Sequence, residues 1–502
     1  MVILQITVAL IFIVIMITAK KKWMIPAGWA LIFVAGTLLY TVIYSFDSGR
    51  IDLGIVFSAA ISSIRNFIVN NDFAGYAGSV GSNIYLAASI VCLLSVFMTI
   101  LTAAKIVLSH FSGHLYLLFF GKSRHICVFT DTSTDTVHLA RSINNHIKKP
   151  LCVFLNCGRT AELESGKNIL FLKDSAGKRL GELKSEVFIC SEDDSENLKM
   201  YEKLSRQLAH SRYYVFTEHC EAAVNKEELL VRYLLVADKF IPAKLINNTR
   251  AQICIIGDNK LAVELCKELI VQCQNITGLP QITIVGADAE DNFAFFTKSN
   301  LELSDCAELT FVNAPPMSVA GIKALTESEY HLYFFCDGNK NLPSLIPAEK
   351  TVELPEYKAV YDYDVIVNFS LDKEAKELNA EYERNYGKGK SGAVIDAGAE
   401  WMKLSEFHRQ SNRSQAINIP SKKHLHSIGV SLEQLAIEEH LRWNAFHYVN
   451  GWTYGSGADG KKEVKKKLHP CLVPYDELSQ DEKDKDMLFI KKTVNRGGKT
   501  NA

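Results

Sequence analysis

The sequence predicts a membrane-anchored chain in which an α-helical N-terminus of three spans precedes two parallel-sheet α/β domains and a small, mainly helical C-terminal domain. Long apolar runs are confined to the first 110 or so of the 502 residues. Short apolar runs then alternate with helical patterns, which is typical of a parallel sheet. After residue 450, aromatic, glycine and proline residues crowd together, as expected for a compact module.

Three apolar runs near the N-terminus are each long enough to cross about 30 Å of hydrocarbon. They cover residues 2–19, 25–46 and 84–108. A signal peptide is the less favoured alternative for the first run, because no positive charge precedes it and no cleavage site of small residues follows. We therefore expect a transmembrane domain at 1–110 and a linker at 111–124.

The charges beside these runs predict an orientation. Lys20, Lys21 and Lys22 follow the first run, and short loops rich in lysine stay in the cytoplasm. This rule places the N-terminus outside and the C-terminal domains in the cytosol of a multi-pass inner-membrane protein, with the lipid bilayer as a partner.

The segment between the second and third runs contains a further helical pattern. Its apolar residues recur at helical spacing: Leu53, Phe57, Ile61, Ile64 and Ile68. A glycine-rich stretch follows at 72–78, so the segment is laid out like a re-entrant pore loop. The alternative is an amphipathic helix on the outer interface. A potassium filter is not expected, because the stretch lacks a Thr-Val start.

Two α/β domains are expected at 125–245 and 246–421. Strand candidates in the first are 126–129, 151–155, 169–172, 187–190 and 213–217, with helices ending at Asn145 and covering 196–208. Candidates in the second are 252–257, 282–285, 309–312, 332–336 and 364–369, with a helix at 261–272. This order predicts two Rossmann-like units in tandem.

Neither unit carries the glycine fingerprint of a dinucleotide site. The first strand-to-helix turn, 130–135, has no glycine, and Asp131 and Asp135 place negative charge where a diphosphate would lie. The corresponding turn of the second unit, 257–261, keeps one glycine. The units are therefore predicted to be scaffolds for assembly and signal transmission.

Composition and motifs narrow the function further. The formal charge of −1 argues against a nucleic-acid polymer as partner. The chain has no nucleophile elbow, H-E-x-x-H helix or Walker loop, so we expect no enzyme and no cofactor. Its 12 cysteines include no C-x-x-C pair, so we expect reduced thiols and no metal site.

The C-terminal module carries the most specific pattern of the chain. Gly451-Trp452-Thr453-Tyr454-Gly455 is followed by His469-Pro470-Cys471-Leu472-Val473-Pro474-Tyr475, and the pattern extends from Leu435 to Glu482. This segment resembles a ryanodine receptor repeat (RyR) domain, expected at 422–502. The resemblance implies a sensing module, found in bacterial proteins beside sensor or nucleotide-related domains.

A helix at 432–449 would bring His440, Trp443 and His447 onto one face. Aromatic rings beside cations suit a base and an anionic group. The candidate ligand-binding residues are Glu439, His440, Arg442, Trp443, Trp452, Tyr454, Lys467, His469 and Tyr475. The alternative is that the aromatic residues form the module's own core and that the lysines at 461–467 are a solvated loop.

The order of elements also resembles potassium channels with cytosolic conductance-regulating domains. With the RyR resemblance, it predicts a membrane-anchored sensor: an oligomeric channel or membrane-disrupting effector gated by a nucleotide-like ligand. The homo-oligomer would be a tetramer or be built from dimers, and by analogy it would act in bacterial antiviral defence. A membrane scaffold acting through a cytosolic protein partner is the alternative, and a nucleotide-processing enzyme is third.

Overall fold

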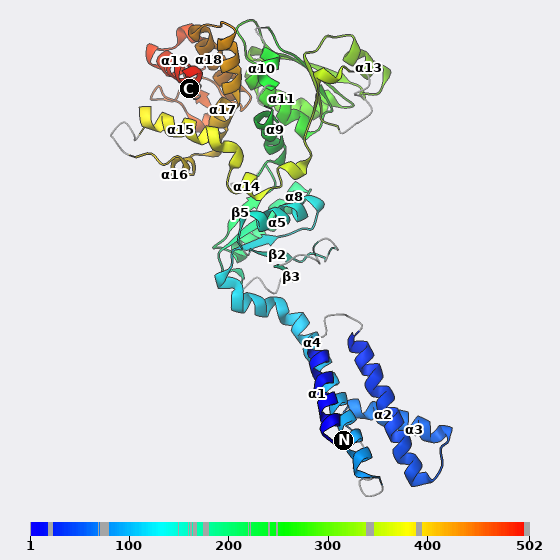
Figure 1. The fold of residues 1–502 in the computed structure, drawn as a ribbon. Coiled ribbons are helices and arrows are strands. Elements are labelled where there is room, and N and C mark those ends of the chain that lie inside the picture. Colours follow the sequence, from blue (N-terminus) through cyan, green and yellow to red (C-terminus); the bar gives the residue numbers. More distant parts are fainter. Residues whose placement is uncertain are drawn as a thin grey trace, which may run out of the picture. The chain divides into compact units, whose positions relative to one another are not determined.

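The computed structural model divides the chain into two compact units, Met1–Ser123 and Arg124–Ala502 (Figure 1). We call them the N-terminal unit and the C-terminal unit and treat each by itself. The structure describes residues 2–18, 24–68, 70, 80–148, 150–158, 160, 163, 168–173, 180–218, 220, 222–238, 241–246, 249–337, 346–387 and 394–495.

The N-terminal unit consists of helices. They are α1 (Val2–Thr18), α2 (Met24–Ser48), α3 (Leu53–Phe67) and α4 (Ser82–Phe120). Among the described residues, two helices are long and apolar enough to cross a membrane, α2 and the part of α4 from Ser82 to Ala104. The prediction of three spans is therefore wrong. The first apolar run forms a helix of 17 residues, which at about 1.5 Å per residue falls short of the hydrocarbon thickness.

The other two predicted spans correspond to α2 and α4. The helix of α4 continues beyond the apolar run, and the short helix η2 (Gly121–Ser123) follows it directly. Most of the segment expected to be a linker is thus helical. Lys20–Lys22 lie outside the described residues.

The helix predicted between the two spans is present as α3, and its small polar face packs on α2. Ser63 Oγ donates to Phe33 O at 2.9 Å, and the Tyr40 hydroxyl donates to Asn66 Oδ1 at 3.0 Å. Gly36 lets the helices approach, since a Cβ there would lie 2.3 Å from Ser63 Oγ. The apolar side chains whose spacing predicted this helix are exposed: Leu53, Phe57, Ile61, Ile64 and Ile68.

Helix α3 runs antiparallel to α2 and returns to the level where α2 begins. Phe67 stacks on Trp29 with ring centroids 4.4 Å apart, and Thr99 Oγ1 of α4 donates to Phe67 O. Val80, just before α4, is buried with Tyr40 near the other end of α2. The chain therefore leaves α3 at one end of α2 and enters α4 at the other. The glycine-rich stretch 72–78 lies outside the described residues.

We predict that Gly36→Ala lowers the melting temperature of the full chain in detergent, because overpacking costs about 1–3 kcal/mol of folding free energy. The added methyl group must displace Ser63 from its bond to Phe33. Gly81→Ala is the control, because a Cβ there meets nothing within 4 Å. Equal melting temperatures for the two variants would contradict the close packing of α2 and α3.

The C-terminal unit contains two five-stranded parallel sheets. The first has the order β3-β2-β1-β4-β5 and the second β10-β9-β6-β7-β8. The strands of the first are β1 (Ile126–Phe129), β2 (Leu151–Leu155), β3 (Ile169–Leu172), β4 (Ser185–Ile189) and β5 (Arg212–Val215). Those of the second are β6 (Gln252–Ile256), β7 (Gln281–Gly286), β8 (Glu308–Asn313), β9 (Leu332–Phe335) and β10 (Thr351–Glu353). Both sheets have the arrangement of Rossmann-like units, as predicted.

One predicted strand, 364–369, is wrong. It contributes to the short helix α14 (Tyr363–Ile366), and the fifth strand of the second sheet is β10. Asp362 caps α14, because its Oδ1 accepts from the backbone N–H groups of Asp364 and Val365. A short apolar run fits a buried helix as well as a strand, and here the cap decides between them.

Helices flank both sheets and form the C-terminal region. Those among the sheet strands are α5 (Thr134–His146), α8 (Asp194–Gln207), α9 (Lys226–Ala237), α10 (Ile241–Ile246), α11 (Lys260–Gln272), α12 (Ala289–Ser299) and α13 (Val319–Thr326). Those that follow are α15 (Lys373–Tyr386), α16 (Ala397–Trp401), α17 (Glu406–Ser427), α18 (Leu432–Tyr448) and α19 (Gln480–Asn495), with the short strands β11 (Thr453–Tyr454) and β12 (Leu468–His469).

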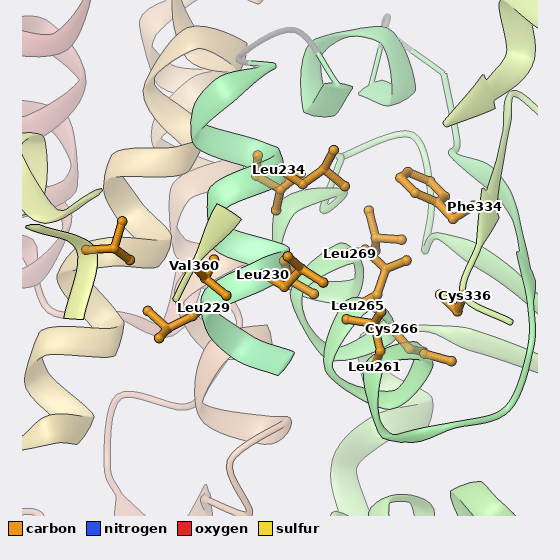
Figure 2. Packing of buried hydrophobic residues seen from close by; sticks show 14 of the residues in the cluster. Leu229, Leu230, Leu234, Leu261, Leu265, Cys266, Leu269, Phe334, Cys336 and Val360 are labelled. Atoms are coloured by element: carbon orange, nitrogen blue, oxygen red, sulfur yellow. The ribbon is translucent and has the colours of Figure 1, made fainter. Parts of the chain in front are cut away.

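One buried apolar cluster extends from the first sheet through the second to α18. Its centre is the contact of α9 with α11, whose side chains Figure 2 shows: Leu229, Leu230 and Leu234 on α9, Leu261, Leu265 and Leu269 on α11, and Phe334 and Cys336 beyond them. The helices that carry the candidate site thus share a continuous core with both sheets.

Candidate ligand-binding site in the C-terminal region

The local sequence fixes both ends of α18. Ser431 and Gln434 form a capping box at its start. Gly451, with φ of +77°, turns the chain back at its end, a conformation that glycine adopts without strain. As a result the Trp452 N–H donates to His447 O, and the indole of Trp452 lies against the last turn of α18.

The turn assembles a group of rings that we call the aromatic cluster: Phe407, Trp443, His447, Trp452 and His469. Trp443 lies 4.0 Å from His447 and 4.9 Å from His469, measured between ring centroids. Trp452 stacks on Phe407 at 5.2 Å. His447 and Trp452 are buried, whereas Trp443 and His469 are partly exposed. The accessible surface of the cluster is therefore formed by Trp443 and His469, together with Phe407, which is also partly exposed.

Both imidazoles of the cluster are held neutral. Burial lowers the pKa of His447 to about 3, and its Nδ1–H donates to Trp443 O at 2.8 Å. Burial, together with the nearby Lys462 ammonium, lowers the pKa of His469 to about 4. His469 Nδ1 accepts from the Cys471 N–H at 3.1 Å, so Nε2 carries the ring proton. The cluster thus offers ring surface and the Nε2–H donor of His469, within electrostatic reach of the Lys462 ammonium.

Glu439 and Arg442, predicted to bind a ligand, are instead buried against each other. Arg442 Nη2 and Nε donate to the Glu439 carboxylate at 2.7 and 3.0 Å. Gln415 donates to the same carboxylate, and Arg442 Nη1 donates to Ser414 Oγ. The pair therefore fastens α18 to α17, and neither charge is available at the surface.

The remaining predicted residues divide between the interior and the rim. His440 is buried, with Nε2 2.8 Å from Val473 O and with Tyr475 packed edge-on against its ring. Tyr454 and Lys467 are exposed, and Lys467 Nζ donates to Asn450 O. Of the nine predicted residues, the structure brings Trp443, Trp452 and His469 together in the aromatic cluster, and His440 stacks on Trp443 with ring centroids 5.8 Å apart.

Sequence reasoning missed Phe407, which lies at the start of α17, before the expected module. It did not select His447 as a site residue, although it placed this histidine on the correct helix face. One residue of the predicted lysine loop does act on the cluster. Burial lowers the pKa of His408, His447 and His469, and the Lys462 ammonium lowers each pKa further.

A cleft of about 430 Å³ lies in the same unit between α9, α11, α17 and α18. The charged residues that line it are Glu218, Glu228, Glu264, Glu268, Glu406, Arg232, Lys267 and Arg413. Carboxylates outnumber cations, and burial raises the pKa of Glu268 to about 7. This cleft is thus poorly suited to a phosphate, whereas the aromatic cluster has a lysine beside it.

Comparison with known proteins identifies the C-terminal region. Residues 415–496 match the RyR domain family. The match begins inside α17 and contains the aromatic cluster except for Phe407. No curated protein and no solved structure matches the chain.

We predict that acidification destabilises the chain partly through His447. The pKa of His447 is about 3 in the fold against 6.5 ordinarily, so between these values only the unfolded chain takes up the proton. Stability is full above pH 6.5 and falls with decreasing pH, by roughly 2 kcal/mol at pH 5. We call the fall in melting temperature from pH 7.5 to 5 the acid limb. His447→Gln should flatten this acid limb.

The matched control is His138→Gln, which changes an exposed histidine on α5. The control should keep the acid limb of the unmodified chain. An acid limb of equal slope in His447→Gln and in the unmodified chain would show that His447 does not stay neutral in the fold.

Proposed function

We propose that this chain is a membrane-anchored sensor whose RyR domain binds a nucleotide-like ligand on the aromatic cluster, and that a homo-oligomer of it forms an ion pathway opened or closed by that ligand. One observation carries the binding half of the proposal. Trp443 and His469 leave ring surface accessible at the edge of the cluster, within electrostatic reach of Lys462.

The chemistry of this surface fits a base bearing an anionic group. A partly exposed tryptophan ring such as Trp443 can stack on a planar base, a contact worth about 1–3 kcal/mol per base. His469 Nε2–H can donate to a base edge, and the Lys462 ammonium offsets phosphate charge. If the aromatic residues served only as the core of the domain, the burial of Trp452 and His447 would be explained. The partial exposure of Trp443 and His469 would not be.

The N-terminal unit supports the pathway half of the proposal. Helix α3 lies between two apolar helices and returns along α2 through hydroxyl and amide contacts. This is how a re-entrant helix is held beside two spans. Two spans from one chain cannot enclose a pore, so the pathway requires several copies, as a tetramer or an assembly of dimers.

The proposed location is a bacterial inner membrane with the C-terminal unit in the cytosol. The cytosolic location of the C-terminal unit does not require α1 to be a span. The lysines at 20–22 would keep the start of α2 in the cytosol, and α2 and α4 would then cross in opposite directions. A role in antiviral defence belongs to the same proposal and rests on analogy with sensor architectures alone.

A second candidate is a membrane receptor without a pore that acts through a cytosolic protein. It is favoured by the described part of α4, where the Ser89, Ser95 and Thr99 hydroxyls donate to carbonyls one turn back in their own helix. Hydroxyls engaged in this way have no proton left to donate to an anion. The two candidates share the binding site and differ in output.

The binding site is tested by thermal shift of the full chain in detergent with nucleotides, dinucleotides and cyclic oligonucleotides. A ligand at 100 times its Kd should stabilise the protein by about 2.7 kcal/mol, because it binds the folded form only. Trp443→Ala and His469→Ala should abolish the shift, whereas the control Tyr382→Ala, which removes an exposed ring on α15, should keep it. A shift retained in Trp443→Ala would rule out the aromatic cluster.

The output is tested by ion flux across liposomes that contain the full chain. A channel should change its flux at least tenfold when the ligand identified by thermal shift is added, and the response should be lost in Trp443→Ala. Flux that does not respond to a bound ligand would favour the receptor without a pore.

A further inference from the structure

A second cluster of reactive side chains lies on the first sheet, away from the RyR domain. In the parallel register, Cys127 of β1 is paired with Glu186 of β4. His125 precedes Cys127 by two residues and so projects from the same face of the sheet. His125 Nε2 lies 2.9 Å from Glu186 Oε2, and the three ligand atoms all lie within 4.8 Å of one another.

We propose that His125, Cys127 and Glu186 form a binding site for a transition-metal ion of the Zn²⁺ class. A thiolate, an imidazole and a carboxylate are the ligand types that zinc takes in proteins. Zinc lies about 2.0–2.3 Å from such atoms, so its ligands are about 3–4 Å apart. The widest spacing, at most 4.8 Å, needs to close by about 1 Å, and the His125–Glu186 distance of 2.9 Å needs to open slightly; side-chain rotation can supply both changes.

The charges and the surroundings also fit an ion. A thiolate and a carboxylate together balance a divalent cation, so the occupied site is neutral where the sheet is buried. Tyr363 donates its hydroxyl to Glu186 Oε2 at 3.0 Å and thereby orients the carboxylate, as partners of metal ligands commonly do. Cys127 is fully buried, whereas the His125 side chain is 40% exposed and gives the ion a route in.

The site would join two strands close to the point in the chain where the N-terminal unit ends. His125 follows Ser123, the last residue of the N-terminal unit, by two positions. An ion held between β1 and β4 would anchor the start of β1, the first strand after the predicted spans. No metal site was expected here, because Glu186 is distant in the chain and only the sheet register brings it to Cys127.

The test is a Co²⁺ titration of the untagged full chain in detergent after removal of metals by chelation. One equivalent of Co²⁺ should bind and produce a thiolate-to-cobalt charge-transfer band, and Zn²⁺ should displace it. Cys127→Ser should abolish the band, and His125→Ala should weaken Co²⁺ binding at least tenfold. Cys254→Ser is the matched control, because Cys254 is fully buried on the central strand of the second sheet.

A chain that takes up no Co²⁺, or a band of equal intensity in Cys127→Ser, would overturn the proposal. If Cys127→Ser fails to fold, His125→Ala and Glu186→Gln decide the question through the bound-metal content of the folded protein. Unchanged content in both variants would equally overturn it.

Discussion

The arrangement of the C-terminal unit depends on one buried carboxylate, that of Asp372. It accepts from Arg232 Nη2 of α9 at 2.7 Å and from Arg413 Nη2 of α17 at 2.8 Å. Burial opposes its charge, but the two guanidiniums hold its pKa below the usual value. Leaving such a charge unpaired costs about 3–5 kcal/mol, so α9, which packs on α11, and α17, which leads into the RyR domain, are held together.

Beside this anchor, further hydrogen bonds tie α17 to α11 and to α18, the helix that carries Trp443 and His447. Gln272 of α11 donates to Ser414 of α17 at 3.0 Å, and Arg442 of α18 donates to the same hydroxyl at 3.2 Å. Helix α17 also carries Phe407, which stacks on Trp452 in the cluster. A ligand that moves Trp443 would therefore act on α17 at two points, at Phe407 near its start and at Ser414 through Arg442. This contiguous network is the physical link by which the proposed sensor would report binding to the sheets.

The sequence predicted most of the two sheets because their strands are short apolar runs bounded by turn residues, and nine of the ten candidate strands formed. It failed at 364–369, where a capping aspartate turned the run into a helix. The candidate site was predicted less well. Helical spacing showed that His440, Trp443 and His447 share a face, but not that Glu439 and Arg442 would pair in the interior. Phe407 and the His125, Cys127 and Glu186 cluster depend on long-range packing, which one-dimensional patterns do not contain.

Helix α3 shows why apolar residues at helical spacing indicate different packing in the two units. In water an apolar stripe is buried, because removing it from solvent drives folding. Between helices in lipid that drive is absent, and small or hydrogen-bonding residues form the contacts instead. In α3 the Ser62, Ser63 and Asn66 face is buried, whereas Leu53, Phe57, Ile61, Ile64 and Ile68 are exposed. Such a surface is stable only against lipid tails or a second copy of the chain. The inverted packing is thus an argument for a membrane environment that is independent of helix length.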